Sequence, residues 1–218
     1  AEAGAVEKIY VEDEAIKYQP IDNRRPKGIC GSGIIDAVAV LLEQGYINRS
    51  GNFVAEDRPR VQTVEGLKRY IIANGEETGT GHPVYINESD IENVITAKAA
   101  IFAAMKILLG RLDLSFDAIQ RFYIAGAFGS YINIEHAITI GLIPDIERSR
   151  FEFVGNASIK GAKIVAFYKE ALYKIEKIRE DTTYYDLMGA NDYVEEFQKA
   201  MFLPHTDIEM FQGSIAHA

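Results

Sequence analysis

The stretch Tyr123–Leu142, YIAGAFGSYINIEHAITIGL, contains an apolar strand pattern that stops on small residues and continues at once as a helix. Gly126 and Gly129 leave the backbone of this turn free of Cβ atoms, and the helix that follows presents unpaired amide groups at its start. Such a turn can lie against the phosphates or the ribose of a nucleotide. In the alternative interpretation, the small residues only allow the strand and the helix to pack closely.

A second unit with the same order of elements follows this turn. Strand FEFV at 151–154 leads through a turn at Gly155 into a long helix expected from 157 to 179. Two strand, glycine turn and helix units in succession favour an α/β layer fold. Further strands are expected at 8–13, 15–20, 67–73, 84–87 and 182–187, and a C-terminal amphipathic helix at 193–201.

A long apolar helix is expected upstream of the turn. Ser89 and Glu92 have the spacing of a capping box, which predicts a helix from Asp90 to Gly110. Lys98 falls on the apolar stripe of this helix. A lysine in that position usually extends its ammonium past its own apolar stem into solvent, but it can also contact a ligand in a cleft.

The segment GICGSG at 28–33 opens another helix. Gly31, Ser32 and Gly33 at the helix start could bind an anion, although capping of the helix by Ser32 explains them as well. Cys30 is expected to be a small buried residue in a tight turn.

Composition excludes several classes of function. The 218 residues carry a formal net charge of -9, which argues against a nucleic-acid partner. Cys30 is the only cysteine, and the four histidines lack ligand spacing, so we expect no disulfide, metal site or cysteine-ligated cluster within this chain. No apolar stretch is expected to span a membrane, and no signal peptide is found, which predicts a cytoplasmic protein. Because the chain begins without methionine, we expect a piece of a longer protein.

Five stretches, in order along nearly the whole chain, resemble the C-terminal region of the reductive activators of corrinoid enzymes. They are GICGSGIIDAVAVLLEQGYINRSGNF, AKAAIFAAMKILL, YIAGAFGSYINIEHAITIGLIPD, VGNASIKGAK and FQKAMFLPH. Proteins of this family use ATP to support electron transfer from an iron–sulfur domain to the cobalt of an inactive corrinoid protein, which returns Co(II) to Co(I). Their ATPase core belongs to the superfamily of acetate and sugar kinases, heat-shock ATPases and actin.

The resemblance implies an α/β fold in which residues 1–218 form the C-terminal part of an actin-like ATPase domain. This part would be an incomplete ribonuclease-H-like lobe with a mixed sheet flanked by helices. In the superfamily, a glycine-rich turn after a strand lines the adenosine, and a helix of the same lobe supplies a basic residue. The implied nucleotide-binding residues are Gly31, Ser32, Gly33, Lys98, Gly126, Ala127, Phe128, Gly129 and Ser130. No residue receives a catalytic role.

The chain departs from the family in two respects. It has no match to the two Asp-x-Gly-Thr phosphate-binding turns or to the iron–sulfur domain, so both are expected upstream. ATP with Mg²⁺ and the iron–sulfur cluster are then cofactors of the complete protein, and this chain alone should be inactive. The expected partners are the corrinoid protein and the rest of the same protein or a second chain, with a homodimer as one option. Two alternatives stay open: a docking module that binds the corrinoid protein without nucleotide, and a small-molecule kinase lobe.

Overall fold

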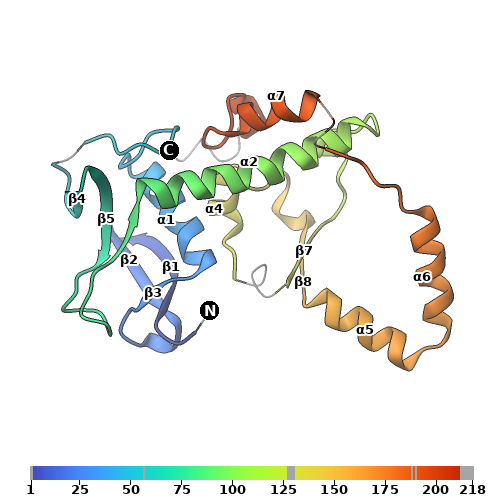
Figure 1. Ribbon diagram of the computed structural model, residues 1–218, viewed down its shortest axis with the longest axis horizontal. Helices are drawn as coiled ribbons and strands as arrows, with labels where there is room; N and C mark the ends of the chain where they lie inside the picture. The colour runs from blue at the N-terminus through green and yellow to red at the C-terminus, as the bar shows by residue number, and fades with distance from the viewer. Residues whose placement is uncertain (1, 56, 127–130, 188, 190, 212–218) are drawn as a thin grey trace.

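The computed structural model describes residues 2–55, 57–126, 131–187, 189 and 191–211 (Figure 1). The strands are β1 (Ala5–Glu12), β2 (Ala15–Pro20), β3 (Gly28–Ile29), β4 (Val61–Val64), β5 (Leu67–Ala73), β6 (Val84–Asn87), β7 (Phe122–Ala125) and β8 (Phe151–Gly155). The helices are α1 (Gly31–Glu43), α2 (Glu88–Gly110), α4 (Ile134–Thr139), α5 (Ala157–Phe167), α6 (Glu170–Asp181) and α7 (Asn191–Ala200). These elements confirm the predicted mixed α/β class.

The strands form three small sheets, in the orders β2-β1-β3, β4-β5-β6 and β7-β8. The β1–β2 and β5–β6 pairs are antiparallel, whereas β7 and β8 run parallel with Phe122 opposite Phe151. The segment 182–187, expected as a strand, is not one, and no strand among the described residues pairs with it. A local sequence pattern can favour an extended conformation, but it does not predict whether a neighbouring strand is present to form hydrogen bonds with it.

Helix α1 is fixed to β1 by very close packing and by side-chain hydrogen bonds. A Cβ on Gly33 would lie 2.3 Å from the carbonyl oxygen of Val6, so only glycine fits there. The Ser32 hydroxyl donates to the carbonyl of Glu7 at 2.8 Å. One turn further along α1, Asp36 Oδ2 accepts the amide of Ile9 at 3.1 Å. Side chains of α1 therefore provide hydrogen-bond partners for two backbone groups of β1, the Glu7 carbonyl and the Ile9 amide.

The long helix α2 extends along much of the molecule (Figure 1). It starts with a capping box made by Asn87 and Asp90, and not by the predicted Ser89 and Glu92. Asn87 Oδ1 accepts the amide of Asp90 at 2.8 Å, and Asp90 Oδ2 accepts the amide of Asn87 at 3.0 Å. The prediction was two residues late because the last residue of β6 already serves as the N-cap.

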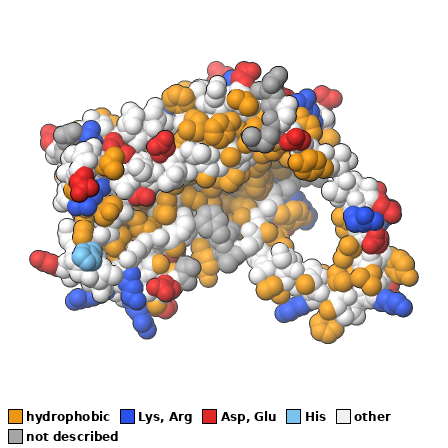
Figure 2. Space-filling model, viewed as in Figure 1, with side chains coloured by type: hydrophobic (Ala, Val, Ile, Leu, Met, Phe, Trp, Pro, Cys, Tyr) orange, Lys and Arg blue, Asp and Glu red, His pale blue; other side chains and the backbone are white. Residues whose placement is uncertain are grey.

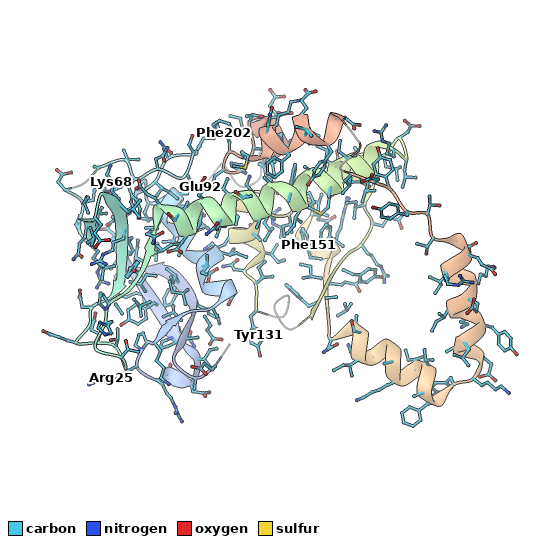
Figure 3. All side chains as sticks on the ribbon, in the orientation of Figure 1. Arg25, Lys68, Glu92, Tyr131, Phe151 and Phe202 are labelled. Carbon is cyan, nitrogen blue, oxygen red and sulfur yellow. The ribbon has the colours of Figure 1, made fainter. Side chains whose placement is uncertain are left out.

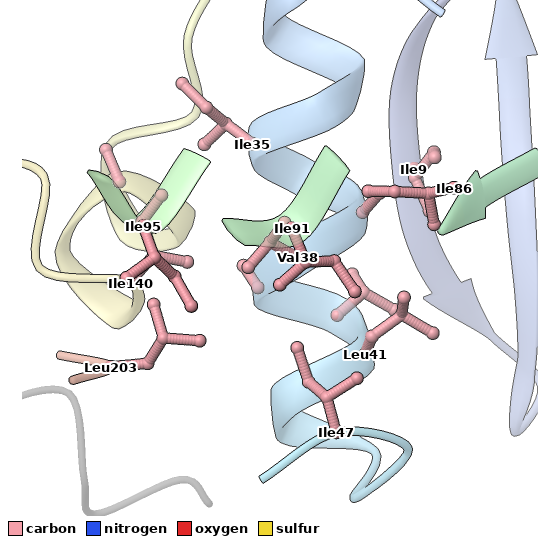
Figure 4. Close-up of a cluster of buried hydrophobic side chains, with 14 of the residues drawn as sticks. Ile9, Ile35, Val38, Leu41, Ile47, Ile86, Ile91, Ile95, Ile140 and Leu203 are labelled. Atoms are coloured by element: carbon pink, nitrogen blue, oxygen red, sulfur yellow. The ribbon is translucent and has the colours of Figure 1, made fainter. Parts of the chain in front are cut away.

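Branched aliphatic side chains from α1, α2 and the adjoining strands and loops form the core. Figure 4 shows them around α1, with residues of α2 and of the C-terminal segment packed against it. The buried side chains in this view include Ile9, Ile35, Val38, Leu41, Ile47, Ile86, Ile91, Ile95, Ile140 and Leu203. Each such side chain stabilises the fold by about 1.5 to 3 kcal/mol through the apolar area that it removes from water.

By length and composition alone, α2 could cross a membrane. It has 23 residues and a window with mean hydropathy 1.5, which corrects the expectation that no stretch approaches this length. One such helix among the described residues is weak support for a membrane span, because the core helix of a soluble protein passes the same test. Ile91, Ile95 and Phe102 of α2 are buried in the core described above.

The helix predicted from 157 to 179 is two helices, α5 and α6, which break at Tyr168 and Lys169. They form an arm that leaves the body of the protein after β8 (Figure 1). Apolar side chains lie on the surface of this arm, as Figure 2 shows, and Phe167 and Tyr173 are 80% and 75% exposed. The sequence pattern could not locate the break, because helical periodicity continues across it.

The buried Lys98 and the surface residue Arg49 hold the C-terminal segment 202–205 against the body. Lys98 Nζ donates to the carbonyls of Phe202 at 2.5 Å and Pro204 at 2.7 Å. Arg49 Nε donates to the carbonyl of Leu203 at 3.0 Å, and the same guanidinium donates to that of His205. Four consecutive carbonyls are therefore bound by these cations in alternation. Burial, and next to it the charge of Arg49, lowers the pKa of Lys98 to about 7.

A buried carboxylate makes a second anchor for the same segment. Glu196 Oε1 lies 2.9 Å from His205 Nε2 and 2.7 Å from Lys106 Nζ. Burial by itself would raise the pKa of Glu196, but the hydrogen bonds from His205 and Lys106 outweigh it and lower this pKa to about 2.

We predict that Lys98→Met lowers the free energy of unfolding by about 1 to 3 kcal/mol, because two carbonyls lose their buried donor. The measurement is urea unfolding of the full-length protein, with limited proteolysis near residue 202 as a second probe. Lys163→Met, at an exposed lysine of α5, is the control and should change stability by less than about 0.5 kcal/mol. Equal effects of the two variants would contradict the anchoring role of Lys98.

We predict that Glu196→Gln destabilises the protein near neutral pH and that the loss shrinks in acid. The folded-state pKa of Glu196, about 2, lies below its ordinary value of 4.5, so its contribution is fully present above that value. The contribution is lost as pH falls through the window between them. Urea unfolding at about pH 6 and about pH 3 measures this change. The control is Glu195→Gln, at a surface pair with Lys199, and its loss of stability should depend little on pH. A pH-independent loss of stability in Glu196→Gln would disprove the lowered pKa of Glu196.

Candidate functional site

A cavity of about 440 Å³ lies where β1, α1, the start of α4 and β8 meet. It is lined by Lys8, Ile9, Tyr10, Asp36, Tyr131, Ile132, Asn133, His136 and Phe153. Segments distant in sequence meet here, and residues 131–136 follow directly after the glycine turn that the sequence predicts to bind nucleotide. Figure 3 shows Tyr131 on the chain between the α1 body and the β7–β8 pair. We call this space the seam cavity.

A buried hydrogen-bonded pair, Asp36 and His136, forms one wall of the seam cavity. Asp36 Oδ1 lies 2.6 Å from His136 Nδ1, and the Asp36 side chain is almost fully buried. The other oxygen of the same carboxylate accepts the Ile9 amide. An ionised carboxylate only accepts hydrogen bonds, so Nδ1 of His136 carries a proton. Among the described residues Nε2 has no hydrogen-bond partner, and this atom is left for a ligand.

The orientation of His136 is also fixed by the start of its own helix. Asn133 is the N-cap of α4, and its Oδ1 accepts the amides of Glu135 at 3.0 Å and His136 at 3.4 Å. The amide nitrogen of the Asn133 side chain has no part in this cap. It is a hydrogen-bond donor in a residue that lines the seam cavity.

Gly126 ends β7 in a backbone conformation that favours glycine. Its φ is +95°, and a Cβ added there would meet no atom of the described residues within 4 Å. Among the described residues no atom packs against this position, so the described part of the structure leaves the backbone of Gly126 accessible to a ligand. The other predicted residues of the turn, Ala127, Phe128, Gly129 and Ser130, lie outside the described residues.

The structure gives Ser32 and Gly33 a packing role in place of the predicted anion site. Both are buried against β1 through the contacts described above, while Gly31 is exposed. Capping by Ser32 is also wrong, because the N-cap of α1 is Cys30 and makes no side-chain cap bond. The Ser32 hydroxyl at this helix start is used in its hydrogen bond to the Glu7 carbonyl of β1.

The expected orientation of Lys98 is wrong as well. Its side chain is 1% exposed, and its ammonium donates to the carbonyls of Phe202 and Pro204, so it neither reaches solvent nor points toward Gly126. Lys98 and Gly31 do line one apolar cavity of about 410 Å³ between α1 and α2, and Gly126 does not. Sequence periodicity correctly predicted that Lys98 lies on the buried face of its helix. It could not predict which distant carbonyl groups accept hydrogen bonds from Lys98.

A larger cavity, of about 720 Å³, lies elsewhere, beneath the C-terminal half of α2. Four of its charged lining residues pair with one another: Lys106 with Glu196, and Arg148 with Asp145. Among the described residues no group of three or more His, Cys, Asp and Glu side chains could hold a metal ion.

Sequence reasoning missed the pair of Asp36 and His136, because the four histidines had been set aside as scattered. One signal was present. Asp36 lies among Ile34, Ile35 and Val38 on the helix that the sequence predicts. A carboxylate on such a face needs a partner, since burial of an unpaired charge is costly.

Comparison with known proteins identifies the family. A sequence model described as the C-terminal domain of RACo, the ASKHA domain, matches residues 1–214. The corrinoid activation enzyme RamQ of Eubacterium limosum is 34% identical over 202 residues, which are 89% of this chain and 34% of RamQ. The [Co(II) methylated amine-specific corrinoid protein] reductase of Methanosarcina barkeri is 28% identical over 163 residues, 75% of this chain and 26% of that protein.

A solved structure agrees with these sequence matches. The reductive activator for corrinoid, iron-sulfur protein superposes with a TM-score of 0.89 and 40% identity, over 98% of this chain and 34% of that one. The chain thus spans about a third or less of the length of these relatives. The match confirms both the resemblance and the actin-like ATPase class predicted from the sequence. The chain belongs to the family of C-terminal ASKHA domains found in the reductive activators of corrinoid proteins.

Proposed function

We propose that this chain supplies nucleotide-binding contacts to an ATP-dependent reductive activator, which returns a corrinoid protein from Co(II) to Co(I). The relatives named above are a corrinoid activation enzyme, a Co(II) corrinoid protein reductase and a reductive activator. The observation that supports the nucleotide assignment is Gly126, which follows β7 with a φ of +95° and has no atom of the described residues within 4 Å of its Cβ position. The complete activator would work in the cytoplasm.

The residues of this chain fit one side of a nucleotide. The backbone at Gly126 can approach a base or sugar, and the seam cavity, lined by residues 131–133 and 136 further along the chain, offers polar groups from β1 and the start of α4. When bound, ATP supplies the free energy of phosphoryl transfer, which needs Mg²⁺ and phosphate-binding groups to stabilise the transferring charge. We propose that these groups belong to Asp-x-Gly-Thr turns elsewhere in the complete protein, so that residues 1–218 alone do not hydrolyse ATP.

The residues of this chain do not fit an iron–sulfur cluster. Cys30 is the only cysteine, and its thiol lies 3.3 Å from both the Val6 carbonyl oxygen and the Ser32 hydroxyl. A cluster needs several thiolate ligands together. We therefore propose that the electrons reach the cobalt from another domain of the complete protein.

A second candidate function is a docking module for the corrinoid protein without nucleotide binding. The acidic net charge and the apolar side chains exposed on α5 and α6 favour this alternative, because exposed apolar surface is frequently used to bind other proteins. Nucleotide affinity distinguishes the two functions, since a docking module has none.

We predict that Gly126→Ala in the full-length protein weakens ATP binding by about tenfold, because an added Cβ occupies space that the nucleotide approaches. The matched control is Gly66→Ala in the β4–β5 hairpin. Gly66 has a φ of +83° and the same open space around its Cβ position, so the strain of the substitution is similar at the two sites.

Equilibrium binding of labelled ATP in the presence of Mg²⁺ measures the effect, and thermal unfolding measures the strain. The two variants should lose similar stability, and only Gly126→Ala should lose affinity. If both variants bind ATP as the wild type does, or if the wild type binds none, the nucleotide assignment is wrong.

A further inference from the structure

We propose that the arm formed by α5 and α6, residues 157–181, is an internal interface of the complete activator. Its exposed apolar side chains pack against polypeptide of the same protein that lies outside residues 1–218, and the corrinoid protein docks elsewhere. The inference goes beyond the proposed function, because it requires no nucleotide. It starts from the apolar side chains that the arm leaves open to solvent (Figure 2).

Helix α6 has the sequence pattern of a helix that packs against a core. Its apolar side chains recur at spacings of three and four residues, which places them on one side of the helix. That side is open to solvent, because Leu172, Ile175 and Ile178 are 50%, 43% and 64% exposed. Lys177 and Glu180 lie on the opposite side. We call the open row the α6 stripe, and it consists of Ala171, Leu172, Ile175 and Ile178.

The contacts that fix the arm to the body lie near its two ends. At its start, Lys160 Nζ donates to the carbonyl of Val154 on β8 at 2.6 Å. Beyond its end, the guanidinium carbon of Arg111 lies 5.2 Å from the centre of the Tyr185 ring. Between these points, Ala171 is the only described residue of the arm that is buried. Both ends of the arm are thus held, while most of its length has no described surface to pack against.

Helices as short as these need a packing partner in water. Helix α5 has 11 residues and α6 has 12, and isolated helices shorter than about 12 to 15 residues are marginal. Gly161 in the interior of α5 weakens that helix further relative to alanine. Helix α7, with 10 residues, has such a partner, because it packs along α2 with Phe197 and Ala200 against the core. The described residues provide no comparable partner for the arm.

The strands from which the arm leaves are also incomplete. Among the described residues, β7 and β8 form a sheet of only two strands, and two strands alone are marginally stable in water. Tyr123 on β7 and Phe153 on β8 are 55% and 47% exposed. Because α5 begins directly after β8, one further part of the protein can cover both this sheet and the arm.

The charge of the arm indicates the chemistry of the surface that covers it. Residues 157–181 contain six lysine and arginine residues and four acidic ones, although the whole chain has a net charge of -9. The ion pair within the arm joins Arg179 to Glu176 of the same helix. We therefore expect the covering surface to be apolar where it meets the α6 stripe and acidic around it.

Three occupants could cover the arm: the corrinoid protein, a second copy of the chain, and the rest of the same protein. The corrinoid protein has to leave once it is reactivated, so the arm would lose its packing in every cycle. The relatives are about three times as long as this chain, so a complete protein of the family has ample polypeptide to cover the arm. A covalently attached partner can act at an effective concentration of about millimolar, whereas a second copy acts only at the concentration of the protein. These arguments favour the rest of the same protein.

The test is hydrogen exchange measured by mass spectrometry on the full-length protein, without nucleotide and without the corrinoid protein. Peptides covering 157–181 should exchange at least roughly tenfold more slowly than unstructured peptides of the same sequence. Ile175→Gln places a polar side chain on the α6 stripe and should accelerate the exchange of these peptides by roughly tenfold. Lys177→Gln, on the opposite side of α6, is the matched control and should exchange as the wild type does.

Exchange in the wild type decides between the three occupants even if Ile175→Gln does not fold. Fast exchange of the arm that slows only when the corrinoid protein is added overturns the inference and supports the docking module. Protection that grows with protein concentration also overturns it, because a second copy then covers the arm. Fast exchange under all conditions, or an Ile175→Gln variant that exchanges as the wild type does, overturns it as well. The proposed function is tested separately, because this experiment contains no ATP.

Discussion

One buried carboxylate joins the parts of the protein that make the candidate site. Asp36 belongs to α1, and its two oxygens bind the amide of Ile9 on β1 and the imidazole of His136 on α4. A carboxylate without these partners would be too costly to bury, so α1, β1 and α4 are held in one arrangement. That arrangement places the start of α4 beside β1, and the seam cavity lies between them. The site thus depends on an interaction within the protein that exists before any ligand binds.

The C-terminal segment shows the same principle at another place in the fold. Lys98 and Arg49 donate hydrogen bonds to the carbonyls of residues 202–205 in alternation. These carbonyls follow the end of α7, and the two side chains give them hydrogen-bond donors. The buried charge of Lys98 therefore stabilises the fold. At the seam cavity, in contrast, polar residues such as Asn133 and His136 line an open space. Lys98 thus binds groups within the protein, whereas Nε2 of His136 has no hydrogen-bond partner among the described residues.

Much of the fold could be predicted from the sequence, because periodicity and turn residues act locally. The α/β class, the long helix α2 and the strand before the glycine turn follow from such patterns. Contacts between distant segments do not. Ser32 bonds Glu7, and Lys98 bonds the carbonyl of Pro204 more than a hundred residues away, and neither pairing leaves a local signature. Asp36 was detectable only as an acid on an apolar helical face, and its partner could not be chosen among four histidines.

Hydrogen exchange in the full-length Asp36→Ala variant tests this account most directly. If Asp36 joins β1 to α4, the peptides covering 5–12 and 131–140 should lose protection together, because the Ile9 amide and His136 lose the same partner. Peptides covering β5 and β6 should keep their protection, since the two hydrogen bonds of Asp36 described above go to Ile9 and His136 and not to that sheet. Unchanged protection, or loss in only one of the two segments, would contradict the claim that this carboxylate assembles the site.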